Sequence, residues 1–508
     1  MTDKGCPLHS NARQTSKSQR QNWSDVMKRY LPLIAGPTML LLAGCMVGPK
    51  YTRPTAPTAP TFKEAPTDQS GWAPGQPSDA ALRTNWWEMY QDPQLNALEA
   101  QVNGANQTLK IAEANFRSAR AAIGLAKSRE APTIGTGASV STLRESADEP
   151  YFLTNLANNG GGDLTMPIDM NYEIDLWGRI RRGVTAAREQ AQASDADMES
   201  VRLSLHAELA TDYFGLRSAD GQEKLLDDTI KAYRDALQLT QDRFNGGLAL
   251  ESDVTQAEAQ LDQAQVMRTD EEVQRTQFEH AIAVLIGKPP AAVTIPRRPI
   301  DVDTPAVPII PGVVPSELLE RRPDIAAEER RMAAANEQIG IAKAAYYPTL
   351  SLSALAGMEG TSALNWFTWP SRFWAVGPTF SETLFDGGRR HAMNDQVRAN
   401  YDATVATYRQ TTLQAFQQVE DNLAALRILN TEKEQQHRAT AASLKSLDVF
   451  QSRYAGGLDL YLEVVTSQTT ALNNQRNDIE LMQRQLDASV LLIKALGGGW
   501  NTQQLPKL

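Results

Sequence analysis

Side chains that could carry out covalent or metal chemistry are few in this sequence. The chain has 508 residues but only two cysteines and five histidines. The histidines are isolated from one another along the chain, at His9, His206, His280, His391 and His437. No zinc-protease HExxH, phosphate-binding loop or paired-cysteine motif occurs. We therefore expect surface positions on helices for the histidines, no metal, no cofactor, no catalytic centre and no enzyme activity.

Cys45 is the residue whose position indicates a specific covalent modification. It ends the sequence LAGC, which closes a short apolar run preceded by a basic pair at 28–29. A basic region, a short apolar core and small residues form a secretory signal peptide. The ending resembles a bacterial lipobox, in which cleavage between Gly44 and Cys45 leaves the cysteine lipidated. Met27 is an alternative start that gives a signal of more usual length, and Met46 after the cysteine favours the outer membrane.

A second group of polar side chains lies along one predicted strand. Between residues 164 and 176 apolar and polar residues alternate, so that one face is wholly apolar. The other face carries Asp169, Asn171, Glu173 and Asp175. Carboxylates are costly to bury without partners, so we expect this polar face to line water and the apolar face to meet lipid.

Two stretches, Arg243–Gln265 and Arg453–Gln475, repeat the same residue types around a Gly-Gly-Leu turn. Adjacent glycines permit positive φ and a tight reversal, so each stretch is expected to be the bend of a helical hairpin. The bends would form an exposed tip made of Gly246, Gly247, Leu248, Gly456, Gly457 and Leu458.

Charged and aromatic residues flank both bends. They are Arg243, Asp253, Arg453, Tyr454, Asp459 and Glu463. Acids at the start of a helix complement its dipole by about 0.3–1 kcal/mol each, an explanation that is weaker for Glu463 because we place it beyond the first turn. We also hypothesise that Arg453 and Tyr454 hydrogen-bond to Asp253 of a neighbouring chain and close a gate.

The elements that would position these residues occur twice in the same order. Each half has a helix, a pair of strands, a very long helix, a bend and a return helix of about half that length. IGLAKSREAPTI at 123–134 corresponds to IGIAKAAYYPTL at 339–350. In detail we expect one helix that starts at Asp92-Pro93 and ends before Pro132, one first strand at 134–141, a return helix at Ser252–Ile286 and a fourth strand at Phe373–Phe385.

The expected boundaries follow from this plan. They are a signal peptide at 1–44; a lipidated extended tether at 45–84; an equatorial and upper helix at 85–131; a first β-hairpin at 132–177; a long and a return helix at 178–288; an equatorial linker at 289–318; a second upper helix at 319–347; a second β-hairpin at 348–386; a second long and return helix at 387–497; and a C-terminal tail at 498–508.

Charge and hydropathy restrict the class of protein. The formal net charge is −10, which argues against binding to nucleic acid. No apolar run reaches the roughly 20 residues that a spanning helix needs. A membrane accepts strands only as a closed barrel, and four strands cannot close one, so several copies must pool theirs. The fold class is thus an α+β membrane protein.

Aromatic residues gather at one end of the second strand pair. They are Trp366, Phe367, Trp369, Phe373 and Trp374. Such a cluster is typical of the interfacial girdle of a membrane protein, and packing into a core is the alternative.

Together these motifs resemble the TolC/OprM family of outer-membrane efflux ducts, in its lipoprotein (NodT-like) branch. The resemblance covers essentially 45–498 and is carried by VGPKYTRP at 47–54, DPQL at 92–95, PSELLERRPDI at 315–325, AANEQIGIAKAAYYPTL at 334–350, FDGGRR at 385–390 and both Gly-Gly-Leu bends. It implies a homotrimer with a 12-stranded β-barrel, four strands per chain, continuous with a long 12-helix α-barrel and a mixed equatorial domain. It also implies that the bends dock to a periplasmic membrane-fusion adaptor, and that the partner pump in the inner membrane is of the proton-driven RND type.

The function so implied is a passive duct for drugs or other small toxic compounds. Two alternatives remain open: a type I protein-secretion duct with the same fold, and a periplasmic adaptor or coiled-coil scaffold without a pore. The transported substrate is not indicated by any residue pattern.

Overall fold

The computed structural model describes residues 46–56, 61–64, 85–144, 146, 161–300, 308 and 318–508. These residues fold as two compact units, each built from separate stretches of sequence. The strand unit comprises the described residues of 46–51, 124–186 and 336–399, and the helix unit comprises those of 52–123, 187–335 and 400–508. The signal peptide and Cys45 lie outside the described residues.

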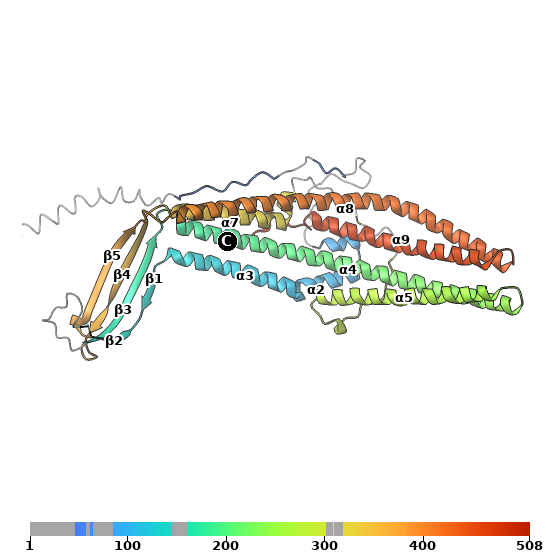
Figure 1. Ribbon diagram of the computed structural model, residues 1–508, viewed down its shortest axis with the longest axis horizontal. Coiled ribbons are helices and arrows are strands. Elements are labelled where there is room, and N and C mark those ends of the chain that lie inside the picture. Colours follow the sequence, from blue (N-terminus) through green and yellow to red (C-terminus); the bar gives the residue numbers. More distant parts are fainter. Residues whose placement is uncertain are drawn as a thin grey trace, which may run out of the picture. The chain divides into compact units, whose positions relative to one another are not determined.

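Two helical hairpins of equal dimensions dominate the chain. Helices α4 (Arg179–Asn245) and α8 (Arg389–Ala455) have 67 residues each, and their return helices α5 (Glu251–Leu285) and α9 (Tyr461–Ala495) have 35 each. Figure 1 shows α5 lying back along α4 and α9 lying back along α8. No proline interrupts the long helices, so their backbone hydrogen bonds continue for about 100 Å at 1.5 Å per residue.

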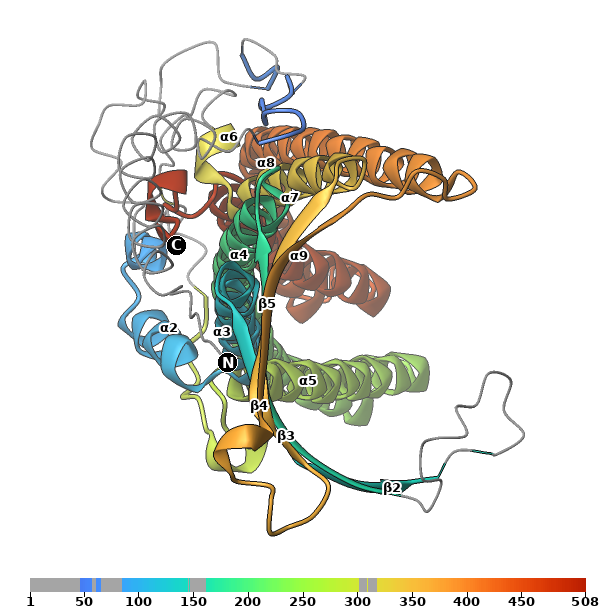
Figure 2. The same cartoon turned by 90° about the vertical axis from the view of Figure 1, so that its left-hand side faces the viewer.

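The strands form one antiparallel sheet in the order β1-β3-β4-β5, with β2 also paired to β3. Their bounds are β1 Thr133–Thr136, β2 Ser139–Leu143, β3 Gly161–Ile174, β4 Thr349–Gly360 and β5 Arg372–Ser381. The sheet is a single curved layer in Figure 2. Strands from both halves of the sequence meet at its centre, where β3 pairs with β4. The paired residues of β4 run from Leu350 to Gly360.

The predicted first strand is divided into β1 and β2, but its register does not change. Thr136 lies opposite Ile168 and Ser139 lies opposite Thr165, so two residues on each side separate the two pairs. Gly137 falls opposite Pro167 and donates to its carbonyl at 3.4 Å. Because proline has no N–H to return, the ladder is interrupted there. The prediction of one strand at 134–141 was wrong in this respect.

Three other predicted element boundaries differ from the structure. The single helix predicted from Asp92-Pro93 to before Pro132 is two α-helices, α2 (Pro93–Ala105) and α3 (Gln107–Lys127), which are separated at Asn106. The fourth strand ends at Ser381 instead of Phe385. The first return helix begins and ends one residue earlier than 252–286. Alternation and periodicity define the interior of an element better than its ends.

The remaining described elements are short apart from α7. They are η2 (Trp86–Tyr90), η3 (Ser128–Glu130), η4 (Pro290–Ala292), α6 (Leu318–Arg321), α7 (Pro323–Ala344), η6 (Trp369–Ser371) and η7 (Thr502–Gln504). The main core lies in the helix unit, where Leu95, Leu209, Tyr213 and Ile282 are fully buried. Among helices of the described residues, none has the length and apolar character needed to cross a bilayer.

The first described residues are held against the strand unit. Val47 donates its N–H to the carbonyl of Trp177 at 3.1 Å. Gly48 has φ +117°, and a Cβ there would meet the Cα of Gly340 at 2.6 Å. Pro49 accepts from the buried Arg182 through its carbonyl at 3.3 Å. The VGP sequence after Cys45 therefore has a defined seat.

Candidate functional site

The register of the sheet places most of its large apolar side chains on one face, while Leu143, Leu355 and Phe373 lie on the other. Ile168 lies opposite Ala356, and Ala356 lies opposite Trp374 on β5. Directly opposed residues share a face, so these side chains and the alternate residues along each strand form one apolar surface. Within the single chain this surface is uncovered, since Ile168 is 53% and Trp374 77% exposed. Exposed apolar area of this extent indicates a lipid or protein partner.

The opposite face holds the predicted polar residues. Asp169 and Asn171 point to the side of the sheet shared by Ser351, Ser353 and their partners on β5. Gly135 lies opposite Asp169, and a Cβ at that glycine would meet the carboxylate at 2.8 Å. The role of these residues in lining water stays a prediction.

Glu173 and Asp175 have a further role that the sequence did not indicate. Glu173 accepts from Nε of Arg179 at 3.0 Å and from its Nη2 at 2.5 Å. Asp175 accepts from the backbone N–H of Arg181 at 2.9 Å and from its Nε at 3.3 Å. The hydrogen bond that Arg179 donates to Glu173 raises the pKa of Arg179. The two carboxylates therefore fasten the first turn of α4 to the end of β3.

Three of the five aromatic residues beside β4 and β5 are exposed, and Trp366 and Phe373 are partly buried. Phe367 is 63% and Trp369 76% exposed. Arg372 places its guanidinium over the ring of Trp369, and Trp366 stacks at a tilt on Phe367 with ring centroids 4.9 Å apart. Packing into a core, the alternative we considered, does not fit these exposures in the described chain.

Both Gly-Gly-Leu turns adopt the same backbone conformation. Gly247 has φ 72° and Gly457 has φ 75°. The N–H of Leu248 reaches the carbonyl of Arg243 at 2.8 Å, and Leu458 makes the same bond to Arg453 at 2.9 Å. A left-handed glycine followed by this backward bond is the Schellman ending of a helix. The six predicted tip residues thus form two matching turns.

Besides the predicted Leu248 and Leu458, the tip exposes two leucines that sequence reasoning did not single out, Leu250 and Leu460. Leu248 and Leu458 are each 72% exposed, and Leu250 and Leu460 are 67% and 73% exposed. The pattern Gly-Gly-Leu-x-Leu was visible in both copies and could have identified the second leucine. Four uncovered leucines on two adjacent turns make an apolar contact surface, which we call the tip leucines.

Among the six predicted gate residues, some form an ion pair within one turn and one caps a helix of the same chain. Arg453 forms a bidentate pair with Asp459 of its own turn, at 2.5 and 3.0 Å. Asp253 accepts the N–H of Leu250 at 3.2 Å and so caps α5. Glu463 lies in the first turn of α9, so placing it beyond that turn was wrong. A link from Arg453 and Tyr454 to Asp253 of another chain stays a prediction.

Arg243 connects the first hairpin to the second. Its Nη1 donates to the carbonyl of Tyr454 at 2.7 Å and to that of Ala455 at 3.1 Å. Its guanidinium carbon also lies 4.7 Å from the centre of the Tyr454 ring. Tyr454 is only 5% exposed and packs with Tyr461, Val464 and Val465. Sequence reasoning named Arg243 but could not identify this partner.

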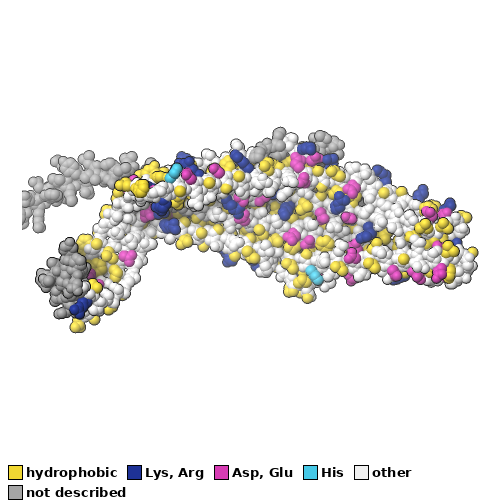
Figure 3. All heavy atoms as spheres, viewed as in Figure 1, with side chains coloured by type: hydrophobic (Ala, Val, Ile, Leu, Met, Phe, Trp, Pro, Cys, Tyr) yellow, Lys and Arg dark blue, Asp and Glu magenta, His cyan; other side chains and the backbone are white. Residues whose placement is uncertain are grey.

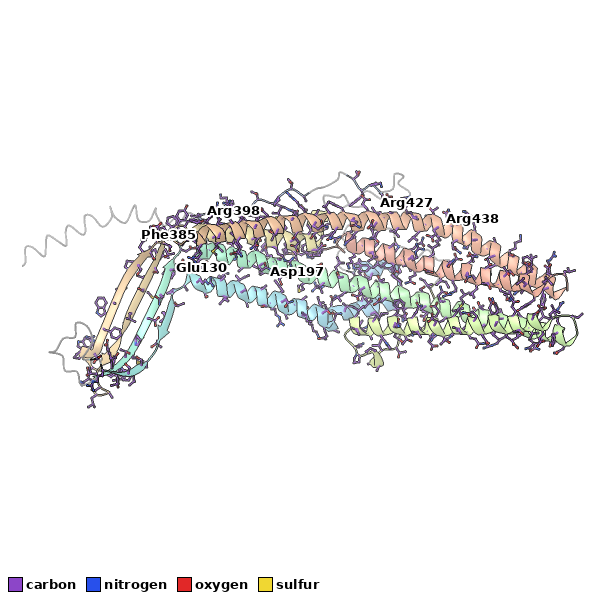
Figure 4. The ribbon with its side chains drawn as sticks, viewed as in Figure 1. Glu130, Asp197, Phe385, Arg398, Arg427 and Arg438 are labelled. Atoms are coloured by element: carbon purple, nitrogen blue, oxygen red, sulfur yellow. The ribbon has the colours of Figure 1, made fainter. Side chains whose placement is uncertain are left out.

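Charges elsewhere on the helices are interspersed in sign, as Figure 3 shows. Many form ion pairs, such as Arg427, labelled on α8 in Figure 4, which donates to Glu64 at 2.5 Å. No group of three or more His, Cys, Asp or Glu side chains suited to a metal ion occurs within the described ranges.

Comparisons with known proteins agree with this geometry. The family described as "Outer membrane efflux protein" matches residues 96–288 and 314–498. The chain is 31% identical over 464 residues to outer membrane protein OprJ of Pseudomonas aeruginosa, covering 91% of this chain and 94% of OprJ. It is 30% identical over 481 residues to the solvent efflux pump outer membrane protein SrpC of Pseudomonas putida, covering 94% and 99%.

Solved structures with the same fold include outer-membrane channels. The structure of the outer-membrane channel OprN superposes with a TM-score of 0.81 at 28% identity, over 90% of this chain and 100% of that one. The Campylobacter jejuni CmeC outer membrane channel superposes with a TM-score of 0.83 over 91% and 96% of the two chains. At 22% identity the CmeC comparison shows the fold alone.

Proposed function

The chain belongs to the outer membrane efflux protein family, among channels of the TolC/OprM type, and from this membership we propose that it is the outer-membrane component of a tripartite efflux system. Three copies would pool their strands into a 12-stranded barrel and their helices into a 12-helix tunnel. The duct would be passive, with energy supplied by a proton-driven RND pump in the inner membrane.

The observation that carries this proposal is the one-sided sheet. Its apolar face is uncovered in the single chain, and β5 and the β1–β2 line are its edges among the described strands. Edge strands in a bilayer leave backbone groups without partners. Pooling the edges of several copies would satisfy those groups and present the apolar face to lipid. The number of copies that we propose, three, is the one that the resemblance to the TolC/OprM family implies.

We further propose that the tip leucines, together with Gly246, Gly247, Gly456 and Gly457, receive the periplasmic adaptor. Support comes from their exposure on two matching turns at the ends of the helical hairpins. The relatives' names mention solvents, toluene and antibiotics, so small toxic compounds are the proposed cargo. These names favour efflux over protein secretion, and family membership argues against an adaptor without a pore.

The proposed anchor is a lipid on Cys45 after removal of residues 1–44. The fixed position of Val47 to Pro49 on the strand unit supports this, because these residues closely follow the proposed lipidated cysteine and are bound to Trp177 and Arg182. Mass spectrometry of the purified N-terminus tests it, and an unmodified chain that begins at Met1 or Met27 would contradict it.

The central experiment is native mass spectrometry of the protein released from detergent, combined with drug-susceptibility assays. We expect a trimer, and loss of the protein should sensitise cells to antibiotics or solvents. A folded monomer would overturn the barrel, whereas a trimer whose loss changes no susceptibility would overturn the efflux role.

A further inference from the structure

A group of aromatic and apolar side chains lies where the strands lead into the long helices. Trp177 follows β3, Tyr346 and Tyr347 precede β4, and Leu384 and Phe385 follow β5. Leu384 is 87% and Phe385 89% exposed, and about two fifths of each tyrosine is exposed. Figure 4 labels Phe385 at this corner of the strand unit. We call these five residues the junction band. It lies at the opposite end of the strands from the predicted aromatic cluster.

The aromatic members of the junction band are held in place by contacts within the strand unit. The ring of Trp177 stacks on Tyr347 with centroids 4.7 Å apart, and its Nε1 donates to the carbonyl of Pro348 at 2.7 Å. The guanidinium carbon of Arg390 lies 5.4 Å from the centre of the Tyr346 ring. The rings therefore have defined positions although they are only partly buried.

The first described residues mark the side of the junction band that faces lipid. Val47 is bonded to the carbonyl of Trp177, and a Cβ at Gly178 would meet Cγ of Met46 at 2.7 Å. Cys45, the proposed site of lipidation, is the residue before Met46. Acyl chains on that cysteine can reach the bilayer only from the outside of a barrel. With this anchor, Trp177 lies on the lipid side and at the surface of the membrane.

The length of the apolar face of the sheet agrees with this position. Its register on β3 runs from Leu164 to Ile174, and Ile174 lies opposite Leu350, which lies opposite Phe380 on β5. Ten steps of about 3.4 Å extend about 34 Å along the strand. At the tilt of about 35–45° found in membrane barrels, this face is about 24–28 Å tall, close to their apolar band of about 25 Å. The junction band follows directly after it, at the level of the lipid head groups.

Cations outnumber acids around the junction band, in contrast to the net charge of −10 of the whole chain. Seven Lys/Arg and five Asp/Glu occur in the surrounding segments, which are 46–50, 173–182, 337–350 and 380–390. Four of the arginines form ion pairs with four of these acids. One acid, Glu382, and three cations have no ion pair among the described residues; the cations are Lys50, Lys343 and Arg389. This surplus of positive charge favours an anionic lipid.

We propose that the junction band and its unpaired cations bind the head groups of anionic phospholipids in the periplasmic leaflet of the outer membrane. Tryptophan and tyrosine suit this level because their rings have an apolar body and a polar end. Leu384 and Phe385 contact the adjoining part of the acyl chains, and Lys50 and Arg389 pair with lipid phosphates. This inference rests on the proposed barrel and anchor, and it adds a noncovalent lipid site to the covalent lipid on Cys45.

Native mass spectrometry of the full-length protein tests the preference for anionic lipid. The protein is released from detergent that contains equal amounts of phosphatidylglycerol and phosphatidylcholine. We expect the trimer to retain phosphatidylglycerol about 25-fold more, which is about fivefold for each of two surplus positive charges. Arg389→Gln and Lys50→Gln should each lower this preference about fivefold. The matched control is Arg144→Gln, because Arg144 is an exposed arginine at the far end of β2; it should leave the preference unchanged.

Only variants that remain trimeric are compared. Lys50 lies outside the helices and strands, so Lys50→Gln carries the test if Arg389→Gln fails to assemble. Denaturing mass spectrometry separates the noncovalent phospholipid from the lipid on Cys45.

Fluorescence quenching by brominated phosphatidylcholine tests the depth of the junction band. A fluorophore is attached to Phe385→Cys or Arg398→Cys, and the protein is placed in vesicles with bromine near the glycerol or near the end of the acyl chains. The label at 385 should be quenched more by bromine near the glycerol. Arg398 lies nine residues beyond Arg389 on α8, about 13 Å along the helix, as Figure 4 shows. The label at 398 should not be quenched.

Three results would overturn the lipid site. They are equal retention of both lipids by the trimer, an equal loss of preference in Arg144→Gln, and a label at 385 that is unquenched or is quenched more by deep bromine. A parent protein that forms no trimer would instead overturn the proposed function on which the site rests.

Discussion

Asn106 and Arg322 occupy corresponding places in the two halves of the chain, 216 positions apart. Asn106 separates α2 from α3, and its Nδ2 donates to the carbonyl of Leu285 at the end of α5, at 2.8 Å. Arg322 separates α6 from α7, and its Nη1 donates to the carbonyl of Ala495 at the end of α9, at 2.9 Å. Both side chains therefore cap a return helix.

The chemistry of the two caps differs. Asn106 is a neutral amide that also accepts the N–H of Leu109 at 3.0 Å. Arg322 is a buried cation that needs two further partners, Asp324 at 2.6 Å and Gln418 at 2.9 Å. The same joint is thus made by one side chain in the first half and by a charged network in the second.

A similar difference separates the two tips. Arg243 crosses to the backbone of the second hairpin, whereas Arg453, its counterpart, pairs with Asp459 in its own turn. Backbone plan and turn geometry are shared by the two halves, but each side chain meets different neighbours. The halves should therefore respond alike to changes on shared surfaces and unlike at the joints and tips.

The largest effect is expected on the sheet, where the halves should not differ. Ile168→Arg in the first half and Val376→Arg in the second each place a charge on the apolar face. Each should cost about 2–4 kcal/mol per chain near mid-membrane, and trimer yield in detergent measures it. Asn171→Arg on the polar face is the control. A strong effect of the control and none of the other two would reverse our assignment of the faces.

Removing each cap should lower the stability of the protein by a different amount in the two halves. Arg322→Ala leaves Asp324, Gln418 and the Ala495 carbonyl without their donor and should cost about 3 kcal/mol, as expected for a broken buried pair. Asn106→Ala removes one neutral amide and should cost about 1–3 kcal/mol. Thermal unfolding followed by circular dichroism gives both values, with the exposed Arg438→Ala on α8 as a control (Figure 4). Equal losses of unfolding free energy in the two variants would show that the charge of Arg322 does not make its cap stronger than that of Asn106.

The tips should also differ. Arg243→Ala removes two hydrogen bonds from a charged donor, worth about 1.5–3 kcal/mol for such contacts, and so weakens the connection between the two hairpins at the tip. Spin labels at Leu248 and Leu458 should then give a broader distance distribution by electron-electron resonance. The same labels in Arg453→Ala should keep the parent distribution, because that arginine bonds only within its turn. A broadening of equal size in both variants would contradict the comparison.

The acids in the first turns of the return helices should behave alike if they act only on helix dipoles. Asp253→Asn and Glu463→Gln should each cost about 0.3–1 kcal/mol, measured as a shift in thermal midpoint. Glu463 also lines a cavity of about 130 Å³ between α8 and α9. A rise in single-channel conductance in planar bilayers for either variant would show the additional gate role that we hypothesise.

The smallest effect is a pH dependence confined to the second tip. Arg453 lowers the pKa of Asp459 below its ordinary 3.8. The pair therefore stabilises the turn above that value and is lost as pH falls through the lowered pKa. The Arg243 bonds end on carbonyls, which do not titrate. Because the carboxylate of Asp253 accepts the N–H of Leu250, the comparison is confined to the turns before that residue. Hydrogen exchange, corrected for its intrinsic pH dependence, should increase in acid at 453–458 and not at 243–248, and Arg453→Ala should abolish the difference. An equal increase at 243–248 would refute it.

The sequence alone determined the features that local rules control. The absence of proline predicted two long helices, and their observed lengths are equal. Paired glycines predicted the two turns, because only positive φ permits the reversal. Alternation of apolar and polar residues predicted which side chains of β3 share a face, since the strand period is two. The duplicated motifs also sufficed to identify the family.

Tertiary structure decided which residues become partners. Asn106 breaks a helix whose apolar stripe continues through it, because its amide reaches a carbonyl 179 positions away. His206 is buried by Glu99 and Trp87, which no local pattern connects to it, so the predicted surface position of this histidine was wrong. Arg243 and Arg453 have the same sequence surroundings and different partners. Periodicity encodes the face that an element presents, but the groups that meet that face depend on how distant segments pack.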